Sequence, residues 1–189
     1  MRLAAACGIA APLTFVTGWF IDGLRTDGYD PVRQAISQLA REGAPTRASM
    51  TLAFVAFGVL LPLWAPTLSR LLRSPSLLPV VAVAGLATLA VAALPLTKTP
   101  GGTQDTLHAV AAGIGYVAMT ATPLLAAWAL RRTGHPVPAA VSAAVAIASA
   151  GCLVATLTAD ASGLYQRLGL GLVDAWHVVV AGVVLLRRL

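Results

Sequence analysis

Charged residues are scarce in this chain of 189 residues. Lys, Arg, Asp and Glu together make up 11% of it, whereas hydrophobic residues make up 58% and the mean hydropathy is +0.81. Soluble domains carry about a quarter charged residues. A water-soluble fold of this size could not bury so much apolar surface, so the composition indicates a membrane protein.

Cysteine is also scarce, and the common catalytic motifs are missing. Cys7 and Cys152 both lie inside apolar runs, where they serve as small core residues. The sequence contains no Cys-x-x-Cys, no His-Glu-x-x-His and no Gly-x-Ser-x-Gly. The net charge is +6, but the basic residues sit at the ends of apolar runs and form no stripe with interleaved aromatic residues. We therefore expect no nucleic-acid partner.

Six apolar runs are long enough to cross a bilayer. They cover residues 3–21, 50–71, 77–96, 105–130, 138–158 and 170–187. The first run is longer than the apolar core of a signal peptide, so we expect it to be retained as a span. Together the runs predict an all-α, polytopic bundle of six transmembrane helices in a single integral membrane domain over residues 1–189.

Acidic residues are confined to one side of the predicted bundle, whereas the 13 basic residues are shared almost equally between the two sides, 7 against 6. With six spans, both termini lie on one side, and its short connections and tails contain arginines but no acid: Arg2, Arg70, Arg73, Arg131, Arg132, Arg187 and Arg188. All seven acids are assigned to the other side. By the positive-inside rule, we expect a multi-pass protein of the cell membrane with cytoplasmic termini.

A polar segment, DGYDPVRQAISQLAREGAP at residues 27–45, separates the first two runs. Asp30 is a good N-cap, Pro31 suits the first helical position, and Gly43 can end a helix. The apolar residues between them follow helical spacing on one face: Val32, Ala35, Ile36, Leu39 and Ala40. This predicts an interfacial helix over about residues 30–42, either a lid over the outer mouth of the bundle or a passive helix that shortens the loop.

Two Asp-x-x-His units open the fourth and sixth runs. The stretches QDTLHAVAAG and VDAWHVVVAG align Asp105 with Asp174 and His108 with His177. A spacing of i, i+3 puts both side chains of a unit on one helix face, and ionisable groups in a span need partners inside the bundle. We expect the four side chains to converge, near the first turns of both helices, on one outward-facing polar pocket.

The paired units fit four different roles. They can be structural, with each Asp at a helix N-terminus and each His bonded across the bundle. They can hold a divalent metal such as zinc with all four side chains as ligands. They can relay a proton or bind a solute in a transporter. Finally, His108 and His177 can bind haem from two helices.

Three stretches together resemble a known membrane family. They are YDPVRQAISQLAREGAP after the first run, a His near the start of the fourth run, and GLYQRL before the last. The family is bacterial and archaeal and is catalogued as domain of unknown function 998. The resemblance covers nearly the whole chain and implies a six-span membrane protein without an assigned activity. The positions that it carries over are Tyr29, Arg33, Ser37, His108 and Arg167.

These residues predict a membrane-embedded enzyme that acts on a lipid-like or isoprenoid substrate. Metal binding or acid–base catalysis is assigned to the aligned residues Asp105, His108, Asp174 and His177. Ser37 is assigned the role of a nucleophile or an orienting hydroxyl. Substrate binding, with the arginines on an anionic headgroup, is assigned to Tyr29, Arg33 and Arg167. The alternative is a transporter or accessory protein that binds a solute, a proton or haem at the same groups. In both cases membrane lipids are the expected partners.

Overall fold

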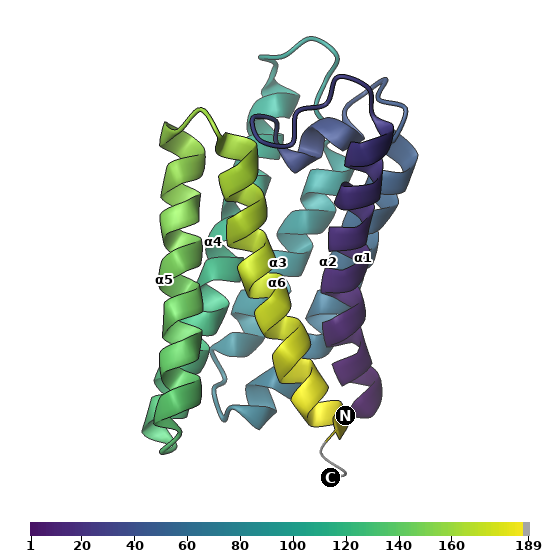
Figure 1. The fold of residues 1–189 in the computed structure, drawn as a ribbon. Coiled ribbons are helices and arrows are strands. Elements are labelled where there is room, and N and C mark those ends of the chain that lie inside the picture. The colour runs from purple at the N-terminus through teal and green to yellow at the C-terminus, as the bar shows by residue number, and fades with distance from the viewer. Residues whose placement is uncertain (187–189) are drawn as a thin grey trace.

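The computed structural model describes residues 1–186, and these form six α-helices and one short 3-10 helix (Figure 1). In chain order they are α1 (Arg2–Arg25), η1 (Ile36–Ala40), α2 (Arg47–Leu71), α3 (Leu77–Ala93), α4 (Thr103–Arg132), α5 (Pro136–Thr158) and α6 (Ser162–Leu186). No strand occurs among the described residues. The predicted all-α bundle is confirmed.

Five of these helices are long and apolar enough to cross a membrane, namely α1, α2, α4, α5 and α6. The remaining helix, α3, is apolar but has 17 residues, which is about 25 Å at 1.5 Å per residue and the lower limit for a span. A polytopic membrane bundle is therefore confirmed. The sixth span stays a prediction that depends on α3.

The helices form a closed ring, because each packs on the next in the chain and α6 packs back on α1 (Figure 1). Close approach is clearest between α2 and α3, where Gly58 and Gly85 face each other. A Cβ on either glycine would lie 2.9 Å from the carbonyl oxygen of the other. Small residues of this kind let membrane helices pack at short distance.

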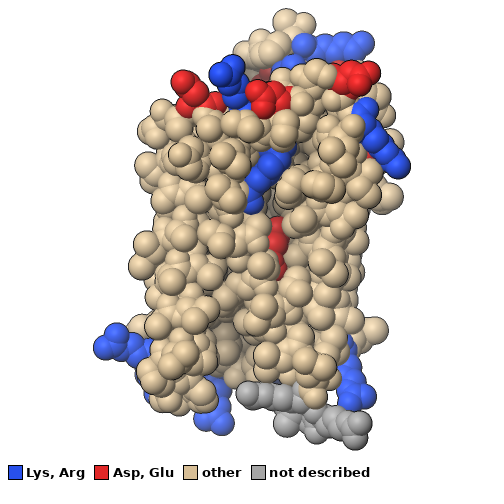
Figure 2. Space-filling view, in the orientation of Figure 1, with Lys and Arg blue, Asp and Glu red and all other residues tan. Residues whose placement is uncertain are grey.

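Charged residues gather at the two ends of the bundle (Figure 2). The end where α1 begins and α6 ends, called the basic end below, carries Arg2, Arg70, Arg73, Arg131 and Arg132. Arg187 and Arg188 were assigned to the same end but lie outside the described residues. The opposite end carries η1 and is called the η1 end. The prediction that all acids lie there is wrong for Asp174, which is buried in the middle of α6.

The segment between α1 and α2 is not the helix predicted over residues 30–42. Residues 31–34 form a turn, and only η1 is helical. Ala35 and Arg41 on either side of η1 are extended, with ψ of 152° and 151°. The N–H of Ile36 donates to Oε1 of Gln166 in α6 at 2.9 Å, so a tertiary contact replaces a helical hydrogen bond. The predicted apolar face is nevertheless partly right, because three of its residues are buried: Ile36, Leu39 and Ala40.

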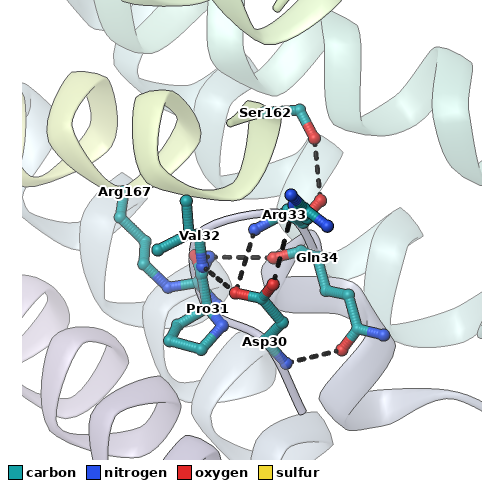
Figure 3. Close-up of polar contacts among 7 residues, drawn as sticks. All are labelled: Asp30, Pro31, Val32, Arg33, Gln34, Ser162 and Arg167. Carbon is teal, nitrogen blue, oxygen red and sulfur yellow. Dashed lines mark hydrogen bonds and ion pairs between the residues drawn. The ribbon is translucent and has the colours of Figure 1, made fainter. Parts of the chain in front are cut away.

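Residues 29–36 dock on the first turns of α6 (Figure 3). The backbone N–H of Leu164 donates to the carbonyl oxygen of Val32 at 2.9 Å, and Oγ of Ser162 donates to the carbonyl oxygen of Arg33 at 2.9 Å. The first N–H groups of a helix have no partner within it, so the bond from Leu164 satisfies one of them. The stretches YDPVRQ and GLYQRL are therefore in direct contact.

Arg167 is the centre of this docking. Its side chain is only 8% exposed, and Nη1 donates to the carbonyl oxygens of Pro31 at 2.8 Å and Gln34 at 2.9 Å. Nη2 donates to the hydroxyl of Tyr29. The guanidinium carbon also lies 5.3 Å from the centre of the Trp19 ring, within the range of a cation–π contact. Arg167 thus fixes the segment that carries η1 to α6.

Substitution of Gly163 tests this docking. A Cβ at Gly163 would meet the carbonyl oxygens of Pro31 and Gln34, which are backbone atoms that cannot move without releasing the segment. We expect Gly163→Ala to lower the free energy of unfolding by about 1–3 kcal/mol, measured by thermal unfolding in detergent. Gly171→Ala is the matched control in the same helix, because its Cβ would meet nothing within 4 Å. Equal stability of the two variants would contradict the docking.

Substitution of Arg167 by Lys tests the guanidinium directly. Lysine keeps the charge but lacks the planar fork, so the carbonyl groups of Pro31 and Gln34 lose donors. We expect Arg167→Lys to reduce stability by about 1–3 kcal/mol and to expose residues 29–46 to limited proteolysis. Arg33→Lys is the control, since that side chain is 75% exposed, and its effect should stay within about 0.5 kcal/mol. Wild-type resistance to proteolysis in Arg167→Lys would count against the assigned role.

Candidate functional site

A cavity of about 70 Å³ lies beneath η1, between α1, α2, α3, α4 and α6. Its wall is mainly apolar and includes three phenylalanine rings, with the Phe15 centroid 5.8 Å from that of Phe54 and 5.2 Å from that of Phe57. A few polar side chains interrupt this wall: Ser37, Thr88, His108, Tyr116 and Gln166. An apolar pocket with few converging polar groups is the usual form of a small-molecule site.

His108 is the polar side chain of the cavity whose position best suits ligand binding or acid–base catalysis. It is 4% exposed, and its Nδ1 lies 2.6 Å from the carbonyl oxygen of Leu94 at the end of α3. A carbonyl can only accept, so Nδ1 carries a proton, and in the neutral ring Nε2 then has a free lone pair. That Nε2 is buried and has no hydrogen-bond partner in the described part of the chain. The ring is therefore held in one orientation, with an acceptor nitrogen left for a ligand.

Ser37 shares this cavity with His108, as predicted for two of the site residues. It is the second residue of η1, so its position depends on how η1 is held. Gln166, which the sequence interpretation missed, accepts the N–H of Ile36 and also lines the cavity. Tyr116, also missed, donates its hydroxyl to the carbonyl oxygen of Tyr165 at 3.3 Å. The available signal for Gln166 was its place beside Arg167 in GLYQRL.

Asp105 does not line the cavity, contrary to the prediction. Its carboxylate accepts the N–H of Thr97 at 2.8 Å, the hydroxyl of Thr97 at 3.0 Å and the N–H of Gly101 at 2.9 Å. These bonds organise the loop between α3 and α4. The carboxylate is therefore occupied by the loop and is not directed at a shared catalytic or metal site.

The two Asp-x-x-His units lie at different depths, so their predicted equivalence is wrong. Helix α6 begins at Ser162, eight residues before the predicted span. Asp174 is therefore the 13th of the 25 residues of α6, whereas Asp105 is the third residue of α4. The stretch before residue 170 was interpreted as a connection because Gln166 and Arg167 interrupt its apolar pattern.

The four predicted metal ligands are not assembled into one centre. Among residues 1–186, no three His, Cys, Asp or Glu side chains are grouped so that they could hold a metal ion. His108 is the sixth residue of α4, and His177 is the 16th of α6. The geometry gives no support to the four-ligand metal site or to haem shared by the two histidines. Asp174 and His177 are both fully within the bundle core.

The three residues predicted to bind substrate lie at the η1 end, outside the cavity lining. Arg33 is 75% exposed, and its Nε is 4.0 Å from Oδ2 of Asp30 (Figure 3), the only ion pair among the described residues. Burial raises the pKa of the Tyr29 phenol, and the Arg167 guanidinium partly offsets this. Tyr29 therefore stays protonated at neutral pH and donates to the carbonyl oxygen of Ala35 at 3.1 Å. The structure gives Tyr29 and Arg167 a positioning role.

The chain was compared with protein families, curated proteins and solved structures. A family model described as "Protein of unknown function (DUF998)" matches residues 9–183. Neither a curated protein nor a solved structure matches the chain. The matched range is nearly the whole chain and includes both the segment that carries η1 and the first turns of α6 on which it docks. The chain therefore belongs to the DUF998 family of membrane proteins.

Proposed function

We propose that this protein binds a lipid-like or isoprenoid molecule in the cavity beneath η1 and that His108 acts on it as an acid–base catalyst. The observation that carries the proposal is the buried Nε2 of His108, which has no partner among the residues that the structure describes, while Nδ1 is held by the carbonyl oxygen of Leu94. An unpaired buried polar atom costs about 1–3 kcal/mol. A ligand that donates a hydrogen bond to Nε2 would recover that free energy on binding.

The cavity lining favours an apolar chain with one polar end. The three phenylalanines of the wall, Phe15, Phe54 and Phe57, would contact the chain, and Ser37 and His108 would contact a hydroxyl or ester group. The cavity volume is about 70 Å³, and a single water needs about 10–15 Å³ by the same measure. The cavity therefore has room for the reacting end of a substrate, and the rest of the chain would extend along the apolar helices.

His108 and Ser37 could transfer a proton although no carboxylate orients His108. In cleavage of an ester, Nε2 of His108 would take the proton of the attacking hydroxyl, either that of Ser37 or that of a water which Ser37 orients, and would return it to the alcohol oxygen that leaves the acyl carbon. If Ser37 attacks, water would then release the acyl group from it by the same proton transfers. Ser37 is then a nucleophile or an orienting hydroxyl. The ring is oriented by the carbonyl group of Leu94, where many catalytic histidines use a carboxylate.

The proposal includes a location in the cell membrane with cytoplasmic termini. The described residues of the basic end include arginines and no acid, which is the pattern of a cytoplasmic face. The η1 end would then lie outside, where the exposed Arg33 can contact lipid phosphates. Membrane lipids would surround the apolar helices.

A non-enzymatic binding protein is the second candidate. It is favoured by the lack of a carboxylate on His108, whose Nδ1 bonds a backbone carbonyl. In this version the same cavity holds the polar end of a lipid, and His108 only accepts a hydrogen bond from it at Nε2. The two candidates share the cavity and differ in whether the bound molecule is changed.

Photo-crosslinking tests the cavity. The purified protein in liposomes is exposed to a photoactivatable farnesol analogue, and cross-linked residues are mapped by mass spectrometry. We expect labelling of the cavity wall, reduced at least about tenfold in Ala112→Leu, which corresponds to roughly 1.4 kcal/mol. Ala121→Leu is the control, because it lies on the same helix in a separate apolar groove. Equal labelling of wild type and Ala112→Leu would rule out this cavity as the binding site.

Substitution of His108 tests the chemistry. Liposomes made from the total lipid of the host cells are incubated with protein, and products are detected by mass spectrometry. We expect conversion by wild type and by His135→Gln, which changes an exposed histidine, and a loss of at least about 100-fold in His108→Gln. Undiminished conversion by His108→Gln would show that His108 is not the base. Cross-linking without any conversion by wild type would support the binding protein instead.

Cysteine labelling tests the orientation and the sixth span. In a variant without Cys7 and Cys152, single cysteines are placed at Ser76 before α3, Gly102 after α3 and Asp160 before α6. An impermeant maleimide added to intact cells should label Gly102→Cys and Asp160→Cys, whereas Ser76→Cys should react only after lysis. The reverse pattern would invert the orientation. Equal labelling at Ser76→Cys and Gly102→Cys would show that α3 does not cross the membrane.

A further inference from the structure

Asp174 and His177 form a second polar site, separate from the cavity beneath η1. Their side chains are 2% and 0% exposed, and neither lines the cavity. Both carboxylate oxygens of Asp174 and both ring nitrogens of His177 are buried without a hydrogen-bond partner among residues 1–186. The spacing of i, i+3 places both side chains on one face of α6. Four unpaired polar atoms one helical turn apart demand a physical explanation.

The depth of this pair makes an isolated charge unfavourable. Asp174 is the 13th of the 25 residues of α6, so about 18 Å of helix lies on each side of it at 1.5 Å per residue. With a hydrocarbon core about 30 Å thick, this position is near the middle of the bilayer. A carboxylate without a counter-charge in such surroundings takes up a proton in preference to staying ionised.

Among residues 1–186, no basic side chain forms an ion pair with Asp174. Helix α6 packs on α5, α1 and α4, and the arginines of these helices lie in their first or last turns. Their other ionisable residues are Cys7 and Asp22 on α1, Asp105, His108 and Tyr116 on α4, and Cys152 on α5. None of these is hydrogen-bonded to Asp174 or His177. Arg167, seven residues earlier in α6, donates to the segment that carries η1.

We propose that Asp174 and His177 are an intramembrane proton-binding pair. In the closed bundle the carboxyl group is a neutral acid and the imidazole is neutral, so the pair has an O–H donor and a ring-nitrogen acceptor that one internal water can bridge. Transfer of the carboxyl proton to the ring nitrogen gives a carboxylate and an imidazolium, and the net charge of the pair stays zero. Loss of the proton from the pair leaves a single negative charge and requires that water enter the core. Proton release is therefore linked to loosening of α6 against its neighbours.

Infrared spectroscopy of the reconstituted protein tests the proton on Asp174. At neutral pH we expect the carbonyl stretch of a protonated carboxylic acid, which shifts in D₂O, disappears in Asp174→Asn, and weakens at alkaline pH. Asp22→Asn is the matched control, because Asp22 is also a buried aspartate but accepts hydrogen bonds from Ser49 at 2.9 Å; that variant should keep the band. If Asp174→Asn fails to fold, Asp174→Glu serves instead and should move the band.

The partnership with His177 has its own test. His177→Asn should shift the carboxylic acid band, because it changes the hydrogen-bond partner, whereas His108→Asn should leave the band in place. Three results would each overturn the proposal: a carboxylic acid band at neutral pH that is unchanged in Asp174→Asn, a band that does not shift in D₂O in the folded protein, or a band that keeps its position in His177→Asn. Farnesol cross-linking of Asp174→Asn should match wild type, so failure of this proposal and failure of the cavity proposal are distinguishable.

Discussion

Buried polar groups in an apolar helix bundle need hydrogen-bond partners, and the two Nη atoms of Arg167 find theirs in backbone carbonyls and a hydroxyl, whereas its Nε has none among the described residues. Its guanidinium group donates hydrogen bonds to the carbonyl oxygens of Pro31 and Gln34 and to the hydroxyl of Tyr29. No acid forms an ion pair with it among the described residues. This contact holds the segment after α1 on the first turns of α6. It thereby places η1 as the roof of the cavity and fixes where Ser37 lies. Loss of this docking would leave the cavity open on one side and would free the hydrogen bond between Ile36 and Gln166.

The polar groups that remain unpaired are as informative as those that are bonded. Asp105 and Asp22 have hydrogen-bond donors around them, so their burial or position is explained by local structure. Nε2 of His108 and the side chains of Asp174 and His177 have none among the described residues, and Nε of Arg41, Nε of Arg167 and Nε1 of Trp64 are also unpaired there. A folded protein rarely leaves such atoms unpaired, and His108, Asp174 and His177 lie inside the region that would cross the membrane. A ligand at His108 and a proton at Asp174 and His177 account for these two places with different chemistry.

Much of the architecture follows from hydropathy alone, whereas the errors come from contacts between distant segments. The helix bounds agree with the apolar runs to within a few residues except at the start of α6. There Gln166 and Arg167 resemble loop residues in sequence, yet they are covered by residues 29–36 and so remain helical. The same contact removes the helix predicted over residues 30–42, although its spacing was helical. The alignment of Asp105 with Asp174 in sequence did not show how deep each residue lies in the bundle. The placement of Ser37 and His108 in one cavity, by contrast, agrees with the predicted lid over the outer mouth of the bundle.

The position of η1 depends on residues 29–36 being held on α6 in the folded protein. Hydrogen–deuterium exchange of the wild-type protein in a lipid environment measures this at single amides, because the N–H groups of Ile36 and Leu164 are used in the docking. We expect both amides to exchange much more slowly than in an unstructured peptide of the same sequence. Exchange at the peptide rate would show that the segment is a free loop, and would leave the cavity without its roof.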